Sequence, residues 1–149
     1  MLIETLKKLY KRDLNKLKTE LETYRSEGAI WKTAQDIPNS AGNLTLHLLG
    51  NLNTYIGAEI GKTGYVRQRE LEFSTKYVPR NELVKQIEEL SKTVENEFES
   101  LSDEDLEKDY PQIVFDDKMT TGYFLVHLST HLAYHLGQIN YHRRLLDEV

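Results

Sequence analysis

The sequence predicts an all-α protein that folds as a single four-helix bundle, with one domain over residues 1–149. At 149 residues the chain is long enough to bury the core of one domain and short for two. Four segments carry apolar residues at steps of three and four, which is the spacing of one face of a helix. No internal repeat or low-complexity tract interrupts them, so the four segments are expected to pack on one another.

The first helix is expected over residues 2–26, where charged residues fill the faces between the leucines. Gly28 ends this helix. Residues 29–37 then form an apolar connector, and with Trp31 it is expected to plug one end of the bundle.

The second helix follows a capping residue, Asn39 or Ser40. One of its rows is polar at steps of four residues and consists of Asn43, His47 and Asn51. Gly50 lies beside this row and has no side chain, so we expect another group to approach the helix closely there.

A long loop, 57–79, is expected between the second and third helices because three glycines and a proline punctuate it. Loops of this length in compact domains tend to be functional or mobile. Its string GYVRQRE supplies side chains that can reach a ligand. The candidates for substrate binding are Tyr65, Arg67 and Arg69 of this loop and Tyr134 of the last helix. The competing interpretation is a solvated loop with surface salt bridges.

The third helix is expected to begin at a cap on Asn81 and to run to about Leu101. A short helical turn capped by Ser102 follows, and then an extended connector, YPQIVFDDK. Thr120 or Thr121 begins the last helix, which is expected to be buried because it is apolar nearly all round. Sequence alone does not give the order of the four helices in space.

The composition of the chain excludes several classes of function. The formal net charge of −5 provides no basic field for nucleic acid, so the expected partner is a small molecule. No cysteine is present, which excludes disulfides, thiolate ligands and a thiol nucleophile of the protein itself. The amino terminus mixes charges with leucines and resembles no secretory signal, so a cytoplasmic protein without a membrane span is expected.

The histidines indicate a metal site. Between Met119 and His142 the chain has no Lys, Arg, Asp or Glu, yet it contains four of the five histidines. His127, His131 and His135 recur every four residues, so neighbours in this row can chelate one divalent ion. The fifth histidine, in the other long uncharged run, supplies a third ligand if the two helices face each other. Either pair of the row satisfies the spacing.

Other interpretations of the histidines are open to different degrees. A zincin protease needs HExxH, whereas the string here is HLAYH, and a ferritin-like di-iron site needs Glu-x-x-His motifs that are absent. Haem ligated by two histidines is a remaining alternative. Neutral structural histidines are another, although each buried imidazole then needs hydrogen-bond partners or costs about 1–3 kcal/mol.

The motif H-x3-H-x-G-Q at residues 131–138 resembles the DinB-like (YfiT-like) superfamily of metal-binding four-helix bundles, and NLTLHLLGNL around His47 is similar to its second-helix histidine. The resemblance covers almost the whole chain. Within the superfamily, the sequence resembles a bacterial branch without an assigned activity. It implies an up-down-down-up bundle that binds one zinc, nickel or iron ion. The implied ligands are His47, His131 and His135.

Further expectations follow from this resemblance. His127 is then a second-layer residue, and the candidates for orienting the ligands are Asn43, Asn51, His127 and Gln138. Better-understood relatives include thiol S-transferases that use bacillithiol or mycothiol and a thiol-dependent isomerase of maleylpyruvate. Many relatives carry Glu where this chain has Leu132, so a role for that glutamate cannot be transferred.

The expected function is therefore a metal-dependent transferase that joins a low-molecular-weight thiol to a small molecule. A metal-dependent hydrolase and a non-enzymatic metal-binding or stress-response module are the alternatives. No catalytic residue is assigned, although His127 and Tyr134 are the available general bases. Because the uncharged surface exceeds what one pocket needs, a homodimer is also expected.

Overall fold

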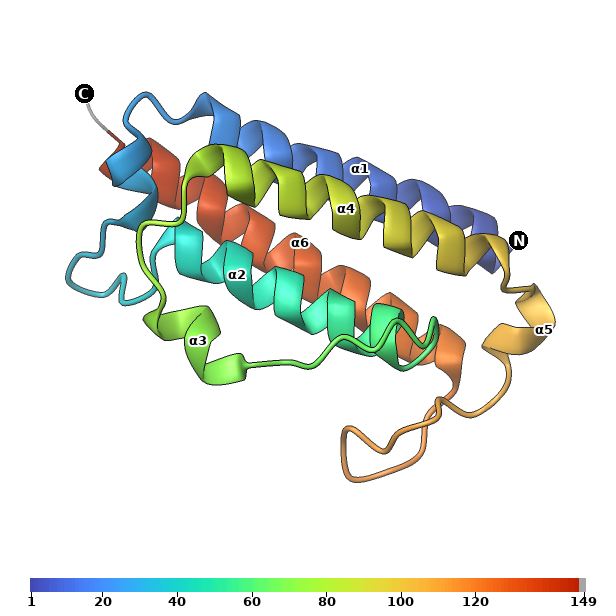
Figure 1. Ribbon diagram of the computed structural model, residues 1–149. Coiled ribbons are helices and arrows are strands. Elements are labelled where there is room, and N and C mark those ends of the chain that lie inside the picture. Colours follow the sequence, from blue (N-terminus) through green and yellow to red (C-terminus); the bar gives the residue numbers. More distant parts are fainter. Residues whose placement is uncertain (148–149) are drawn as a thin grey trace.

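The computed structural model describes residues 1–147, and these form helices joined by loops (Figure 1). The four long helices are α1 (Leu2–Thr23), α2 (Ala41–Leu52), α4 (Arg80–Glu99) and α6 (Thr121–Leu146). Shorter elements are a 3₁₀ helix (Glu27–Trp31), a π-helical turn (Asn53–Ala58), α3 (Arg69–Ser74) and α5 (Asp103–Leu106). The prediction of an all-α four-helix bundle is confirmed.

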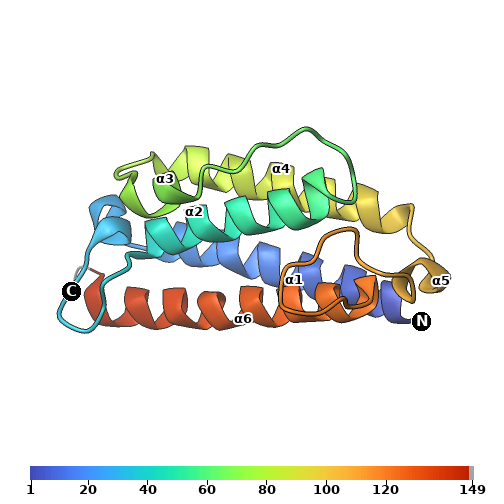
Figure 2. The same ribbon diagram turned by 90° about the horizontal axis from the view of Figure 1, so that it is seen from below.

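The four long helices form a ring in which α1 contacts α4 and α6, and α2 contacts the same two. Figures 1 and 2 show that α1 and α6 run in one direction, whereas α2 and α4 run in the other. This is the up-down-down-up order that the resemblance implied. Because α2 and α4 run in the same direction, the chain between them must cross back along the bundle, which explains the long segment 57–79.

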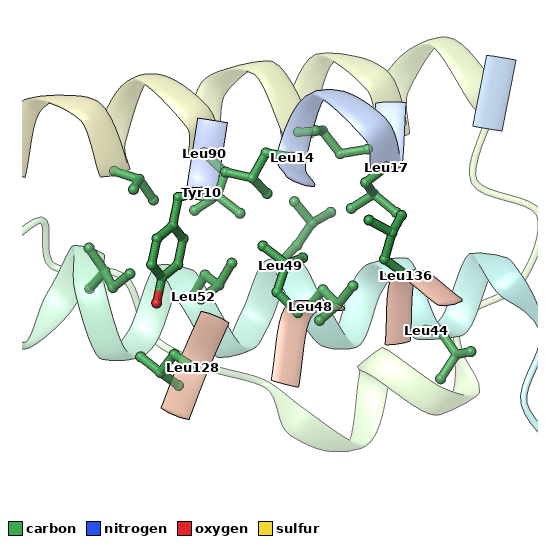
Figure 3. Close-up of a cluster of buried hydrophobic side chains, with 14 of the residues drawn as sticks. Tyr10, Leu14, Leu17, Leu44, Leu48, Leu49, Leu52, Leu90, Leu128 and Leu136 are labelled. Atoms are coloured by element: carbon green, nitrogen blue, oxygen red, sulfur yellow. The ribbon is translucent and has the colours of Figure 1, made fainter. Parts of the chain in front are cut away.

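Leucines from all four helices fill the space between them (Figure 3). The core also holds Tyr10, whose hydroxyl donates to the carbonyl of Leu125 at 2.6 Å and whose ring packs edge-on against Phe98 at 5.1 Å. Its hydroxyl therefore has a partner although it is buried. Each fully buried leucine contributes about 1.5–3 kcal/mol to stability.

Local signals placed several helix ends correctly, but the predicted end of the first helix at Gly28 is wrong. α1 ends at Thr23, because the backbone N–H groups of Arg25 and Ser26 donate to the carboxylate of Asp147 instead of continuing the helix, and Gly28 lies in the following 3₁₀ helix. Ser40 caps α2, Ser102 and Asp105 form a capping box at α5, and Thr120 caps α6. The predicted cap on Asn81 is wrong because α4 begins at Arg80, one residue earlier. There the carboxylate of Glu27 accepts the backbone N–H of Arg80 at 3.1 Å, so a residue distant in sequence takes the role of the cap.

The segment 57–79 is more structured than the sequence indicated. It contains α3, which packs on α2, and it is preceded by a π-helical turn that continues α2. Three residues with positive φ, Lys62, Gly64 and Tyr77, mark its bends. The expectation of little regular structure in this segment is therefore wrong at α3.

The last helix is buried on one side only, which corrects the prediction that it is buried all round. It contacts α1 and α2, and its outer side exposes Tyr123, Val126, Tyr134, Tyr141 and Leu145. An uncharged sequence thus does not imply a buried helix. The homodimer stays a prediction for this surface, and the particle mass from light scattering tests it. Within residues 1–147, no helix is long and apolar enough to cross a membrane.

At the end of the bundle beyond the connector, His142 joins three elements. Its Nδ1 lies 2.7 Å from the hydroxyl of Tyr24 at the end of α1, and its Nε2 lies 2.8 Å from the carbonyl of Lys32. The carbonyl can only accept, so Nε2 carries the proton and Nδ1 accepts from Tyr24. Ala29, Ile30 and Trp31 are buried beside this end, so the connector plugs the bundle as predicted.

We expect His142 to make stability depend on pH. Burial lowers its pKa below 6.5, so below that pH the unfolded chain takes up a proton that the folded protein does not. The unfolding free energy of the metal-free protein should fall as the pH drops from 7 to 5. His142→Gln keeps a donor and an acceptor but does not titrate, so it should reduce this slope by at most about 1.4 kcal/mol per pH unit. Urea unfolding measures the slope, and an unchanged slope would contradict the assignment.

Candidate metal centre

Three histidines from two facing helices meet in the middle of the bundle. His47 is on α2, and His131 and His135 lie one turn apart on α6. One ligand atom of each lies within 4.8 Å of the others, and within residues 1–147 this is the one such group of three His, Cys, Asp or Glu side chains. We call these three residues the histidine cluster.

The geometry of the cluster suits a single ion. The Nε2 atoms of His47 and His131 lie 3.3 Å apart. Two nitrogens that bind one zinc ion at about 2.0–2.1 Å in tetrahedral geometry are themselves about 3.3 Å apart. The ring of His135 lies 5.2 Å from that of His47 and 4.5 Å from that of His131, so side-chain rotation suffices to complete a three-nitrogen set.

The imidazoles of His47, which is buried, and His131, which is partly buried, are neutral at physiological pH, as metal ligands must be. Burial is the main cause of a fall in the pKa of His131 from 6.5 to about 4, and neighbouring positive charges add to it. Burial also lowers the pKa of His47, although its hydrogen bond to Glu72 acts in the opposite direction. Protons therefore compete weakly with an ion for these two nitrogens.

A buried carboxylate, Glu72, holds His47 in place. Its Oε1 lies 3.0 Å from Nδ1 of His47, and because a carboxylate only accepts, Nδ1 carries the proton. This leaves the lone pair of Nε2 directed toward the cluster. Arg67 donates to both oxygens of Glu72, from Nε at 2.8 Å and from Nη2 at 3.1 Å. The guanidinium thus neutralises a carboxylate that would otherwise be costly to bury.

The short helix α3 brings Glu72 to this position. Asn43 donates from Nδ2 to the carbonyls of Glu72 at 2.9 Å and Thr75 at 2.8 Å, which attaches α3 to α2. A Cβ on Gly50 would lie 1.9 Å from Oε2 of Glu72, so only glycine leaves room for the carboxylate. The expectation of a close approach at Gly50 is confirmed, and the approaching group is Glu72.

The residues predicted to orient the three histidine ligands differ in whether they contact the histidine cluster. Oε1 of Gln138 is 2.6 Å from Nδ1 of His135, so this amide fixes one ligand directly. Asn43 acts on the cluster indirectly, through α3. Asn51 makes no hydrogen bond through its Oδ1 within residues 1–147, and Nδ1 of His131 is likewise buried without a partner. Two buried polar atoms near the cluster thus have no hydrogen-bond partner among the described residues.

A cavity of about 310 Å³ opens beside the histidine cluster. Its lining includes His47 and His131 of the cluster together with Arg67 and Arg69. The rest of the lining is largely aromatic and includes Tyr55, Phe115, Phe124 and His127. A small molecule in this cavity would lie next to an ion held by the cluster, as catalytic metal sites require.

Of the predicted substrate-binding residues, Arg67 and Arg69 line this cavity, whereas Tyr65 and Tyr134 do not. Tyr65 lines a different cavity. Tyr134 is exposed next to His135, and the centres of the two rings are 5.3 Å apart. His127 lies outside the histidine cluster, and its ring meets that of Phe115 edge-on at 5.0 Å.

Sequence reasoning missed Glu72, Tyr55, Phe115 and Phe124. Gly50 was the one signal for Glu72, because a glycine inside a helix indicates a close neighbour without naming it. Phe115 lies in the connector between α5 and α6, where periodicity gives no information.

The match to known families is now informative. The sequence fits the family profile of the DinB superfamily over residues 14–139, well over half of the chain. The chain belongs to the DinB superfamily. The matched range includes the whole histidine cluster and Glu72, and the membership predicted from the last-helix motif is confirmed. A search of curated proteins finds no match.

The residues of this DinB-superfamily protein fit a divalent ion. The cluster offers three nitrogens, two of them with tautomers set by Glu72 and Gln138, and a cavity beside them. Nitrogen ligands of this kind suit zinc, nickel and iron alike, so the cluster supports metal binding without naming the metal.

We expect the protein to bind one divalent ion per chain. His47→Ala, His131→Ala and His135→Ala should each abolish binding, because two imidazoles hold an ion much less tightly than three. His127→Ala removes an imidazole from the same helix but not from the cluster, so it should retain the ion. Elemental analysis of protein purified without a nickel column, followed by metal titration, measures this. Wild-type protein that takes up no metal would contradict the assignment.

A second test addresses Glu72. Gly50→Ala should displace its carboxylate and weaken metal binding about 10–100-fold, which is the usual effect of losing a residue that orients a ligand. Gly137→Ala is the matched control, because its added Cβ meets no atom within 4 Å. The control should keep the affinity and gain up to about 1 kcal/mol of helix stability. Competition with a chelator gives both affinities, and equal values would exclude a role for Glu72.

Proposed function

We propose that this protein is a metal-dependent transferase that joins a low-molecular-weight thiol to an electrophilic small molecule. The observation that supports it most is the cavity beside the histidine cluster, which gives a metal-bound group access to a second molecule. The chain has no cysteine, so the sulfur must come from a cosubstrate. Thiol-dependent activities among better-understood relatives in the superfamily agree with this proposal.

The reaction requires a deprotonated thiol. A divalent ion held by the histidine cluster would lower the pKa of a thiol bound to it. In the transfer, the S–H bond breaks, a bond forms between sulfur and the electrophilic carbon, and the bond from that carbon to its leaving group breaks. The proton ends on the leaving group or on a base of the protein.

Residues of the chain supply the remaining functions. His127 lines the cavity without belonging to the cluster, so its imidazole is the base best placed to receive the thiol proton. Tyr134 is exposed outside the cavity and is less suited. Phe115 and Phe124 add apolar surface to the lining, against which the body of a small molecule can pack.

Hydrolysis is the second candidate, because the same open position can hold a water in place of a thiol. A metal-binding module without catalysis is the third. These three differ in what they need: transfer needs metal and thiol, hydrolysis needs metal alone, and the module has no turnover.

The test is turnover of metal-loaded protein with bacillithiol or a related thiol and an alkylating or chlorinated aromatic substrate. We expect product only when both metal and thiol are present. His131→Ala should abolish turnover through loss of the ion, and His127→Gln should lower kcat about 100-fold or more while the ion stays bound. Arg25→Gln, an exposed charge change at the far end of α1, serves as the control. Product without thiol would establish hydrolysis, and no product across a broad substrate panel would favour the module.

A further inference from the structure

Two arginines line the cavity beside the histidine cluster, and they differ in their hydrogen-bond partners. Arg67 donates from Nε and Nη2 to Glu72, and within residues 1–147 its Nη1 has no hydrogen-bond partner. Arg69 is exposed, lines the same cavity, and has no ion pair among the described residues. One cation is thus already neutralised by Glu72, and the other is available to a ligand.

We propose that this cavity binds a small organic carboxylate with a flat apolar body, held by Arg69 and Nη1 of Arg67. This inference rests on the proposed function, because it assigns the electrophilic partner of the thiol to one chemical class. Guanidinium groups pair with carboxylates through parallel N–H···O bonds, and no Asp or Glu lines the cavity to compete with the ligand.

The aromatic wall accounts for the apolar body. The ring of Phe124 meets Tyr55 edge-on at 5.1 Å and Phe115 at 6.1 Å, so three of the lining residues form one continuous group of packed rings. Arg67 lies 6.0 Å from the ring centre of Tyr55, which places a cation at the border of the aromatic surface. A volume of about 310 Å³ is at the small end for ligand pockets and suits a molecule of about one ring.

A larger cleft does not share these properties. It has about 640 Å³ and lies under the loop between α5 and α6. Its lining contains Asp109, Asp116 and Asp117, with Lys118 as the one cation. This acidic cleft repels a carboxylate, whereas the cavity with Arg67 and Arg69 attracts one.

Calorimetric titration of the protein with benzoate and methyl benzoate tests the proposal. Metal-free and metal-loaded protein are compared, because a carboxylate can also coordinate an ion directly. We expect the ester to bind at least about tenfold more weakly than benzoate, because it has no anionic oxygen for the guanidinium groups. Binding of benzoate should persist without metal.

Variants locate the ligand. Arg69→Gln should weaken benzoate binding about tenfold, whereas Arg25→Gln, an exposed arginine outside the cavity, should leave it unchanged. Phe115→Ala should weaken binding about fivefold or more, and Ile113→Ala, in the same loop but outside the cavity lining, is its control. Circular dichroism and thermal unfolding check that each variant is folded.

Three results would overturn the inference. These are benzoate binding that needs the metal and ignores Arg69→Gln, equal binding of ester and benzoate, and no binding to folded protein. Neither thiol nor turnover enters these titrations. A failed transfer assay with intact carboxylate binding would therefore remove the proposed reaction alone, and thiol transfer without carboxylate binding would remove this inference alone.

Discussion

The buried ion pair between Arg67 and Glu72 is the interaction on which the metal centre depends. This ion pair attaches the segment 57–79 to α2, because Glu72 also contacts His47. The contact directs Nε2 of His47 toward the other two histidines. The carboxylate of Glu72 fits there because Gly50 has no side chain. Losing Arg67 would leave a carboxylate uncompensated beside the core, a change that typically costs about 3–5 kcal/mol. The same ion pair thus links the stability of α3 to the geometry of the histidine cluster. A change that displaces α3 is therefore expected to displace His47 as well.

Local physical rules explain how much of the fold the sequence predicted. Apolar residues at helical spacing gave the four long helices, and Ser40, Ser102 and Thr120 marked helix starts because hydroxyl caps act within a few residues. Spacing also put His131 and His135 on one face. His47 was paired with them through the uncharged character of its helix, and the resemblance to a family made that choice specific.

The features that sequence did not predict are those decided by contacts between distant segments. A helix of six residues, such as α3, is too short to show a period, and nothing in the sequence around Glu72 distinguishes it from an ordinary surface glutamate. The cap of α4 comes from Glu27 rather than from a neighbour in sequence. The exposed side of α6 was missed because an uncharged face packs equally well on the core or on another protein.

The positions of the two arginines explain why Arg67 holds Glu72 whereas Arg69 is available to a ligand. An anion that took the N–H groups of Nε and Nη2 that Glu72 uses would displace Glu72 and release His47, so a ligand compatible with an intact cluster must use the remaining N–H groups, chiefly those of Nη1. The remaining attraction must then come from Arg69, which stands at the cavity without a fixed partner among residues 1–147. With Glu72 neutralised and the buried imidazoles neutral, a divalent ion leaves the cavity strongly positive although the protein carries −5 overall. Such a field attracts a thiolate and a carboxylate alike, so one positive site draws in both reactants of the proposed transfer.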